Sequence, residues 1–551
     1  SFWEKSVQNN HQTSPFDPKF IIAMIAVGAV YFGWQTYLSQ KYPNRLQTAA
    51  VTVDSKESQA PKTPAAADKN SLANNNQVAL SVEQKSDPVP EKILSFDSGK
   101  ASFQISSQGM GLLNYQIKSY EDRQGGKIKI GAVDAKGAGL FALLLQKSEN
   151  PIPFVINEVA PGEYEGTYTN KSTKITRRLK FNEANYSFES SIQILSVDES
   201  LVAGFLLRLP DKINESSKGS LLFPSYEHQD FIIEDQKKKE VVNFNHAKEN
   251  IDKVFKATHL LSVGSQYFAS AILDQSDITP DTKILADINT KHVQAEMVFG
   301  PFQAGQDISF KQILFAGPKV MEVLKASSPD LSVILDHGFF GFISKPLLEI
   351  MKAFYGISKN WGVAIILLTL LVRLCVLPFN IMSFKSMKAM QQIQPQVQGL
   401  REKYKDDPMT LNKEMMALMK ENKANPLGGC LPMLLQIPIF FALYKVIGSS
   451  VELYQSPFFG WIQDLSAHDK FYVLPVLMGI SMFLQQKLTP MTTMDPTQAK
   501  IMMFLPVVFS LFMLNLPSGL TLYMFVSTVF GITQQKLMLG NTQAKTPVLV
   551  S

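Results

Sequence analysis

Apolar and polar residues are distributed unevenly along this chain. Up to about residue 332, most apolar positions fall in short stretches that alternate with polar ones, whereas from about residue 339 they merge into long runs. Alternation is typical of half-buried β-strands, and long apolar runs are typical of membrane helices. The pattern therefore predicts a folded, water-exposed part followed by a membrane part.

Several apolar stretches have the length and character of membrane spans. Five of them form a predicted core and cover residues 360–382, 428–448, 471–487, 500–516 and 519–536. An earlier run, residues 20–38, predicts a retained signal anchor. A cleaved signal peptide is the alternative, but the run is long and ends in aromatic residues. Residues 338–358 mix aromatic with charged positions, which predicts a helix lying in the membrane interface.

Basic residues set the orientation of these spans. The loop 383–427 is rich in lysine, whereas residues 449–469 contain no Lys or Arg. Loops rich in Lys and Arg stay in the cytoplasm. The loops 383–427 and 488–499 and the ends 1–19 and 537–551 are therefore predicted to be cytoplasmic, with the loop 449–470 and the large polar part in the periplasm. This indicates a multi-pass protein of the bacterial inner membrane.

The polar part divides into a linker and a folded domain. Residues 39–92 have few large apolar side chains and are predicted to be a disordered tether, because such a composition cannot bury a core. Residues 93–325 contain many short alternating stretches separated by turn residues, which predicts an antiparallel β-sandwich. The predicted fold class is therefore a membrane α-helical bundle, made of an N-terminal anchor plus a five-helix core, with a large periplasmic antiparallel β-sandwich.

The loop 383–427 has apolar residues at helical spacing on both sides of a break at Asp407 and Pro408. Asp407 is placed to cap a second helix that starts at Pro408. The loop is therefore predicted to form a pair of antiparallel helices. Methionine is frequent in its apolar stripes, at Met387, Met390, Met415 and Met419. These flexible side chains either pack on one another or contact a client chain or the ribosome.

Arg373 is the most informative residue, because it lies inside the apolar run of residues 361–377. A guanidinium stays charged, and placing it at bilayer depth costs at least roughly 3 kcal/mol on insertion scales. The other predicted core spans contain no Asp or Glu that could pair with it. We therefore expect a water-filled cavity, open to the cytoplasm only, whose missing anion arrives with a substrate.

Other polar residues of the core spans have a similar predicted depth and complete this candidate groove. They are Thr369, Gln436, Ser481, Gln485, Ser527 and Thr528. Any one of them can equally join membrane helices through an interhelical hydrogen bond. Their shared depth with Arg373 favours a groove that takes in the polar, often acidic, tail of a nascent membrane protein. The apolar segment of that protein would then pass into lipid along an apolar face.

Composition disfavours several classes of function. The formal net charge is +5, which is small for a nucleic-acid-binding protein. Both cysteines, Cys375 and Cys430, lie in predicted spans, and the histidines are scattered singly. We therefore expect no disulfide in the polar part, no metal and no cofactor. No local carboxylate–histidine cluster indicates catalysis in the sandwich, so the chain is not expected to be an enzyme.

The chain carries a series of specific motifs. They are Asn360-Trp361-Gly362, Val372-Arg373, residues 391–395, Asn425-Pro426-Leu427-Gly428-Gly429-Cys430-Leu431-Pro432, Gln436-Ile437-Pro438-Ile439-Phe440, Trp461-Ile462-Gln463-Asp464-Leu465-Ser466 and Pro517-Ser518-Gly519-Leu520. In these motifs, and over essentially its whole length, the chain resembles the Gram-negative branch of the YidC/Oxa1/Alb3 family of membrane protein insertases.

The resemblance implies an insertase and chaperone with a five-helix core and a β-supersandwich in the periplasm. It implies a hydrophilic groove around Arg373, with Thr369 and Tyr523 beside it. It also implies an apolar slide on the third and fifth spans of the chain, at Ile437, Pro438, Phe440, Val508 and Phe512. The implied partners are nascent membrane proteins, the Sec translocon, the ribosome and the lipid bilayer, without direct recognition of nucleic acid. The tail after Lys536 lacks the lysine-rich extension of some relatives, so contact with the ribosome through the tail is expected to be weak.

Two other classes of function remain as alternatives. A small-molecule transporter would be expected to have hydropathy repeats related by inversion, and none is evident in the sequence. A membrane-anchored periplasmic sugar-binding protein would not need the five later spans. Membrane protein insertion is therefore the preferred hypothesis.

Overall fold

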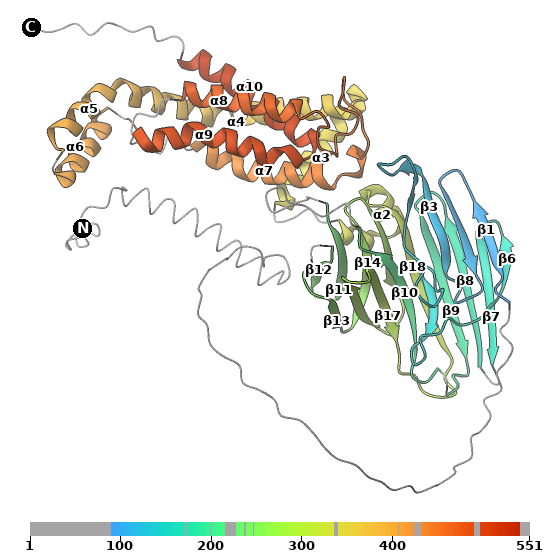
Figure 1. Ribbon diagram of the computed structural model, residues 1–551. Helices are drawn as coiled ribbons and strands as arrows, with labels where there is room; N and C mark the ends of the chain where they lie inside the picture. The colour runs from blue at the N-terminus through green and yellow to red at the C-terminus, as the bar shows by residue number, and fades with distance from the viewer. Residues whose placement is uncertain are drawn as a thin grey trace, which may run out of the picture.

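The computed structural model describes residues 90–170, 173–199, 201–214, 227–235, 238–245, 247–335, 340–405, 407–422, 424, 431–489 and 496–539. The expected signal anchor at residues 20–38 lies outside these residues, as do the expected linker up to residue 89 and the tail from residue 540. The described residues form a β-sandwich and a bundle of helices, which meet at one end of each (Figure 1).

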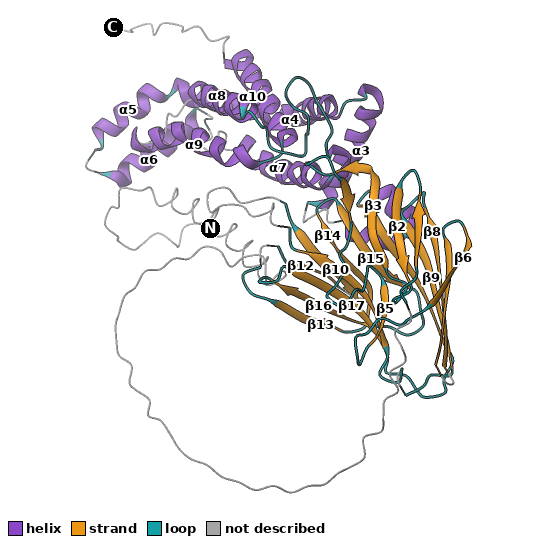
Figure 2. Ribbon diagram, turned by 45° about the vertical axis from the view of Figure 1, so that its right-hand side comes forward, coloured by secondary structure: helices purple, strands orange, loops and turns teal. Residues whose placement is uncertain are grey.

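The first part is built from antiparallel strands in three sheets. The strand orders are β1-β2-β3-β4, β13-β16-β17-β10-β5 and β12-β11-β14-β15-β18-β9-β8-β7-β6. The strand bounds are β1 Ile93–Asp97, β2 Ala101–Ser106, β3 Leu112–Glu121, β4 Lys127–Lys129, β5 Ala142–Leu145, β6 Val155–Ala160, β7 Glu163–Asn170, β8 Thr173–Asn182, β9 Ser187–Leu195, β10 Phe205–Lys212, β11 Gln229–Asp235, β12 Lys239–Asn243, β13 Ile251–Phe255, β14 Thr258–Ser265, β15 Phe268–Asp274, β16 Asp281–Asp287, β17 His292–Phe299 and β18 Ile308–Pro318. Figure 2 shows the sheets, in orange, lying beside the helical part.

Burial alternates along the strands, because successive side chains point to opposite faces of a sheet. In β9, for example, Phe188 and Ile192 are buried whereas Glu189 is exposed. The buried faces of different sheets meet in an aromatic core. Phe310 of β18 packs edge-on against Phe205 of β10, with ring centroids 4.9 Å apart. Apolar burial between facing sheets is therefore the main source of stability in this part.

The second part is helical, and two short helices lead into it. The helix bounds are α2 Met321–Ser327, η2 Pro329–Ile334, α3 Gly341–Ser358, α4 Trp361–Gln392, α5 Gln394–Lys403, α6 Pro408–Glu421, α7 Leu431–Ser449, η4 Val451–Leu453, α8 Val473–Leu488, α9 Pro496–Phe512, η5 Met513–Asn515 and α10 Ser518–Leu539. Figure 1 shows α4, α7, α8, α9 and α10 gathered in a bundle, with α5 and α6 at its far end from the sandwich. A helical bundle joined to an antiparallel β-sandwich confirms the predicted fold class.

The helices of the bundle differ in length. Within the described residues, α4 is the one helix that is both long and apolar enough to cross a membrane, and the apolar segments Leu435–Ser449, Val473–Leu488 and Met503–Asn515 are shorter. At 1.5 Å per residue, the 16 residues of α8 extend about 24 Å, less than the roughly 30 Å of a hydrocarbon core. Helices of this length fit a membrane that is locally thin or hydrated.

The helix α4 extends further than expected. The sequence predicts that the membrane span ends near Met382 and that a hairpin helix follows it. In the structure α4 continues without a break to Gln392, so the first part of the loop 383–427 prolongs this helix. Residues 383–392 contain neither Gly nor Pro, the two residues that most disfavour a helix, so nothing in this segment ends the helix earlier. The predicted second helix is confirmed, since the Asp407 carboxylate accepts a hydrogen bond from the backbone N–H of Thr410 (3.1 Å) at the start of α6.

Polar contacts join the two parts. The Lys352 ammonium on α3 pairs with the carboxylates of Glu322 on α2 (2.8 Å) and of Glu452 in the loop 450–472 (3.1 Å). The side chain of Gln455 donates to the carbonyl of Asp122 in the sandwich (2.8 Å). Because these contacts come from both parts of the chain, they fix the sandwich against the end of the bundle.

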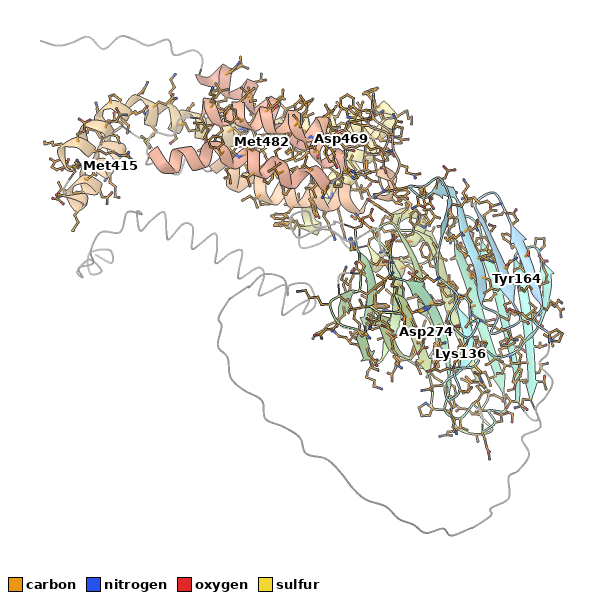
Figure 3. All side chains as sticks on the ribbon, in the orientation of Figure 1. Lys136, Tyr164, Asp274, Met415, Asp469 and Met482 are labelled. Atoms are coloured by element: carbon orange, nitrogen blue, oxygen red, sulfur yellow. The ribbon has the colours of Figure 1, made fainter. Side chains whose placement is uncertain are left out.

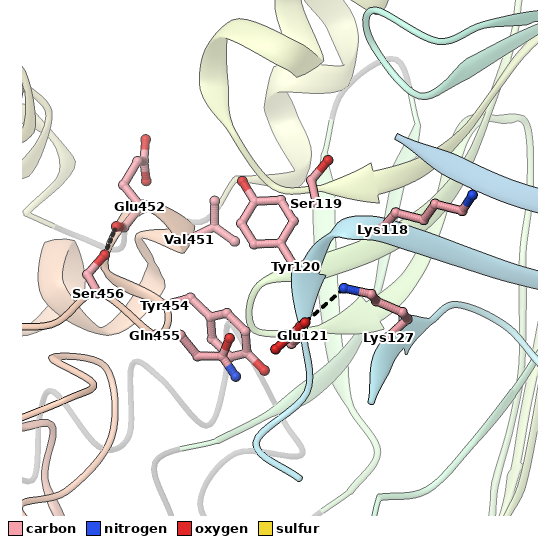
Figure 4. Close-up of a pocket in the computed structure, with 10 residues that line it drawn as sticks. All are labelled: Lys118, Ser119, Tyr120, Glu121, Lys127, Val451, Glu452, Tyr454, Gln455 and Ser456. Carbon is pink, nitrogen blue, oxygen red and sulfur yellow. Dashed lines mark hydrogen bonds and ion pairs between the residues drawn. The ribbon is translucent and has the colours of Figure 1, made fainter. Parts of the chain in front are cut away.

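A polar cavity of about 420 Å³ lies at this junction. It is lined by Lys118, Ser119, Tyr120, Glu121, Lys127, Val451, Glu452, Tyr454, Gln455 and Ser456 (Figure 4). Its charged groups are paired, as with Lys127 and Glu121 at 2.8 Å. We therefore attribute the cavity to the junction between the two parts.

Candidate functional site

The candidate site lies between α4 and α10. Nε of Arg373 donates a hydrogen bond to Oγ of Ser527, at 2.8 Å. Ser527 is buried, whereas Arg373 is only partly buried. In the part of the chain that the structure describes, no carboxylate pairs with Arg373. The titratable side chain that interacts electrostatically with its guanidinium is Tyr523. The guanidinium therefore keeps its positive charge beside neutral groups.

A second polar contact joins the same two helices nearer the hairpin. Nδ2 of Asn380 donates to Oε1 of Gln534, at 3.3 Å. Both contacts connect residues that are 154 positions apart, so α4 and α10 run parallel. The step between the contacts is seven residues on each helix, which returns to the same helix face, as in a coiled coil. Arg373 and Asn380 thus lie on one polar seam.

The helix α8 approaches this seam at Gly531 of α10. A Cβ atom built on Gly531 would lie 2.8 Å from Nε2 of Gln485 and 3.9 Å from Nη2 of Arg373. The lack of a side chain at Gly531 therefore lets the amide and the guanidinium lie close to the backbone of α10. The structure brings together three predicted groove residues, Arg373, Gln485 and Ser527.

The helix α7 contributes Gln436, whose amide donates a hydrogen bond to the hydroxyl of Tyr523. Tyr523 is buried on α10, one turn before Ser527 and on the same face. Gln436 and Tyr523 are therefore neighbours of Arg373 on the side that faces the sandwich. Both residues are in the predicted groove set.

Three other predicted groove residues bond to their own helices. Each is buried, and its hydroxyl donates to the carbonyl oxygen four residues earlier at 2.6–2.7 Å: Thr369 to Ile365, Ser481 to Leu477 and Thr528 to Met524. Hydroxyls in apolar helices commonly satisfy themselves in this way. No hydrogen bond joins these hydroxyls to Arg373 among the described residues.

Apolar side chains are exposed on α7 and α9, where the slide is predicted. Ile437 and Val508 are 43% and 49% exposed. Pro438 lies within α7, which continues through it, and is partly buried. Phe440 packs partly against the core of the bundle, whereas its neighbour Phe441 is 48% exposed. The side chain of Phe512 lies outside the described residues. An exposed apolar surface is thus present on both helices, with Phe441 rather than Phe440 as its open aromatic ring.

The hairpin methionines face inward, which supports the alternative in which they pack on one another. Met390 and Met419 lie in the small hydrophobic core of the hairpin, and Met415 packs against that core. Met387 is buried at the end of α4. Figure 3 shows Met415 at the end of the bundle away from the sandwich. The apolar period reflected packing between helices. On α6, Met409 and Met416 are the methionines with large exposed fractions, 79% and 58%.

The bundle end that faces the sandwich is closed by the loop 450–472. Asn360 caps α4 and donates from its side chain to the carbonyl of Phe458 (3.3 Å). A Cβ on Gly362 would overlap the ring of Phe458, so only glycine lets the loop pack directly on α4. The carbonyl of Asp464 accepts from the hydroxyl of Ser518 (2.7 Å), which ties the loop to the start of α10. The polar seam is therefore covered at this end.

Sequence reasoning missed Asn380, Gln534 and Gly531. A signal was present in the spacing, because Asn380 and Gln534 each follow a groove residue by seven positions and Gly531 follows Ser527 by four. Without the pairing of α4 with α10, an amide near the end of a span cannot be distinguished from an ordinary interfacial residue. Among the described residues, no three His, Cys, Asp or Glu side chains are grouped as metal ligands would be.

Comparison with known proteins gave consistent matches. Residues 164–350 match a model of the YidC periplasmic domain, and residues 353–545 match a model of the 60Kd inner membrane protein family. The membrane protein insertase YidC of Geotalea uraniireducens (strain Rf4) is 36% identical over 446 residues, which cover 78% of this chain and 84% of that protein. The YidC of Syntrophus aciditrophicus (strain SB) is 32% identical over 549 residues, 94% of this chain and 98% of that protein. A crystal structure of an active YidC insertase, 20% identical, aligns with a TM-score of 0.37 over 80% of this chain and 92% of that chain.

Proposed function

The chain belongs to the YidC family of membrane protein insertases, and we propose that it works by capturing the polar tail of a nascent membrane protein beside Arg373. The apolar segment of that protein then moves into lipid along the exposed surfaces of α7 and α9. This process makes and breaks no covalent bond, so the proposed role is not enzymatic. The groove residues are Arg373, Gln485, Ser527, Gln436 and Tyr523, with Thr369, Ser481 and Thr528 in the surrounding helices.

The observation that carries this proposal is the unpaired charge of Arg373. Its hydrogen-bond partner, Ser527, is a neutral hydroxyl. A guanidinium has five N–H donors, and the described residues offer few acceptors to that of Arg373. A transient anion would therefore improve the hydrogen bonding of this side chain. An acidic residue in a translocating tail supplies such an anion. Capture shortens the path that the tail must take through hydrocarbon, where a charged group is costly.

The exposed surfaces of α7 and α9 support the release step. Ile437, Phe441 and Val508 offer apolar contact without closing around a ligand. A transmembrane segment that leaves the groove can remain covered by these side chains until lipid replaces them. The short helix α8, of 16 residues, favours a locally thin membrane, which would reduce the thickness to be crossed.

The family is bound to the membrane and carries a periplasmic domain. We propose that this chain is a multi-pass protein of the bacterial inner membrane, with spans in α4, α7, α8, α9 and α10 and an anchor at residues 20–38. The sandwich and the loop 449–470 then lie in the periplasm, and the hairpin and the tail lie in the cytoplasm, as the distribution of lysine favours. The Sec translocon and the ribosome are the proposed protein partners, alongside nascent membrane proteins and lipid.

Site-specific photo-crosslinking tests this function. A photoreactive residue is placed at Ile437 or Val508, and a ribosome-bound nascent membrane protein is stalled during insertion. Ile480 on α8 is the matched control, because it is apolar and 53% exposed. We expect crosslinks from positions 437 and 508 and few from 480. Equal crosslinking from all three positions would indicate random contact in lipid and contradict the slide.

A further inference from the structure

The contact between Asn380 and Gln534 has a feature that the groove around Arg373 does not explain. Each side chain is an amide with one donor group and one acceptor group. Only Nδ2 of Asn380 and Oε1 of Gln534 are used in their mutual bond. The other two atoms, Oδ1 of Asn380 and Nε2 of Gln534, are buried without a partner. The residues themselves are 3% and 7% exposed.

A half-satisfied amide pair is an unusual arrangement in a buried site. Buried polar atoms are nearly always hydrogen-bonded, and leaving one unmade costs free energy. A pair of apolar side chains would join α4 and α10 without that cost. The amides therefore favour a state in which all four of their polar groups have partners, and this state differs from the closed contact.

The position of the pair shows where such partners would come from. Asn380 and Gln534 lie one heptad beyond Arg373 and Ser527, on the hairpin side. Gln535, the next residue on α10, is also buried and donates to the hydroxyl of Thr489 at the end of α8 (3.2 Å). From Tyr523 to Gln534, polar contacts follow α10 for about 16 Å at helical rise. A chain that enters from the hairpin end meets the amide pair before it meets Arg373.

We propose that Asn380 and Gln534 form an amide clasp, closed in this structure, that opens to bind the main chain of the incoming polypeptide. A peptide unit offers one N–H donor and one C=O acceptor. These groups complement the unpaired acceptor of Asn380 and the unpaired donor of Gln534. The clasp therefore recognises extended backbone of any sequence, whereas Arg373 recognises negative charge. This inference rests on the proposed function, and it assigns to the same groove a second subsite that does not depend on charge.

The clasp predicts a specific response to substitution. In the double variant Asn380→Leu/Gln534→Leu, the two side chains keep a similar volume but lose all polar groups. Its helices should stay packed, and insertion of a substrate with a neutral tail should fall by about tenfold, the factor that corresponds to about 1.4 kcal/mol. The swapped variant Asn380→Gln/Gln534→Asn keeps both amides and should retain most of the insertion rate. Thermal unfolding of both full-length variants, measured in detergent, reports packing separately.

Two results would overturn the clasp. One is insertion at the wild-type rate in the leucine variant while its unfolding temperature is unchanged. The other is a loss of insertion that follows a loss of thermal stability equally in both variants, which would make the pair an ordinary link between helices. A photoreactive residue at Phe384, one turn from Asn380 on α4, leaves both amides in place and gives a direct measurement. Position 384 should capture the tail of a stalled nascent protein, and absence of capture there while Leu370, one turn from Arg373, captures it would refute the clasp and leave the proposed function standing.

Discussion

The Arg373 guanidinium and the Ser527 hydroxyl form a hydrogen bond of 2.8 Å across α4 and α10. This bond orients a permanent cation without neutralising it. The guanidinium is planar and presents its donors in a fixed fork, so fixing Nε also fixes the direction of the remaining N–H groups. In the proposed capture, this prior orientation would lower the ordering cost of binding a carboxylate.

Gly531 sets the space between Arg373 and Gln485. A methyl group in Gly531→Ala would meet Nε2 of Gln485 at 2.8 Å and force the amide away. We expect a several-fold loss of insertion, with little loss of helix stability, because Ala has the higher helix propensity. Insertion assays and thermal unfolding measure the two effects. Gly399→Ala on α5 is the control, because a Cβ there meets nothing within 4 Å; an equal loss of insertion in both variants would contradict this role for Gly531.

Arg208 holds a buried charge cluster in the sandwich. Its guanidinium contacts the carboxylates of Asp134 and Glu296, each at 2.5 Å, and its side chain is 2% exposed. Arg208→Ala leaves these carboxylates unpaired, which costs about 3–5 kcal/mol of unfolding free energy. The exposed Arg178, paired with Glu165, is the control and should cost at most about 1 kcal/mol. Denaturant unfolding decides between them, and similar values for Arg178→Ala and Arg208→Ala would show that burial does not matter here.

Asp274 makes the stability of the sandwich depend on pH. Burial raises the pKa of its carboxyl from 3.8 to about 6, although hydrogen bonds from Ser276 and Gln312 oppose this shift. The folded state then holds the proton more tightly than the unfolded state. The stabilising contribution is complete below pH 3.8 and is lost as the pH rises to about 6. Above that pH the ionised, buried group lowers the unfolding free energy by up to about 3 kcal/mol. Figure 3 labels Asp274 inside the sandwich.

The substitution Asp274→Asn tests this dependence, because the amide oxygen can still accept the hydrogen bond from Ser276. We expect higher stability at pH 7 and a flatter profile between pH 4 and 6, measured by denaturant unfolding across that range. Asp287→Asn is the control, because hydrogen bonds from Thr290 and Asn289 lower the pKa of that partly exposed carboxyl and give the opposite sign. An unchanged profile in Asp274→Asn would refute the role of Asp274.

We predict that Met419 stabilises the hairpin through packing. It is 8% exposed within the hairpin core. Met419→Ala should cost about 2–5 kcal/mol in that core and open α5 and α6 to hydrogen exchange. Met409→Ala should change little, because Met409 is 79% exposed. Hydrogen exchange of the full-length protein provides the measurement. Equal protection of the hairpin in the two variants would contradict a packing role for Met419 and favour contact with another chain.

The sequence was sufficient to predict features that depend on local pattern. Arg373 stood out because its neighbours along the chain are apolar, and Asp407 because it precedes Pro408. Features that depend on register between distant segments could not be predicted. The contact of Asn380 with Gln534 depends on the parallel packing of α4 against α10. The need for glycine at position 362 likewise becomes evident only in the folded chain, where the ring of Phe458 packs against it. The inward methionines show the same limit, since an apolar stripe does not reveal whether it meets its own hairpin or a partner.

Arg177 shows that strand alternation can predict burial where composition does not. Its place in the alternating strand β8 puts it on the buried face, between Ile175 and Leu179. Its guanidinium donates to the carbonyl of Gly109 at 2.7 Å and is fully buried. Composition alone would assign an arginine to the surface. The alternating period of β8 gives the correct, buried face.

The central claim is that the charge of Arg373 attracts acidic tails, and one comparison tests it most directly. Two single-span substrates with the same apolar segment, one with an acidic tail and one with a neutral tail, are inserted by the wild-type protein and by Arg373→Ala. We predict a clearly larger loss of insertion for the acidic tail, with Arg373→Lys recovering part of it because the positive charge is kept. An equal loss for both tails would contradict electrostatic capture.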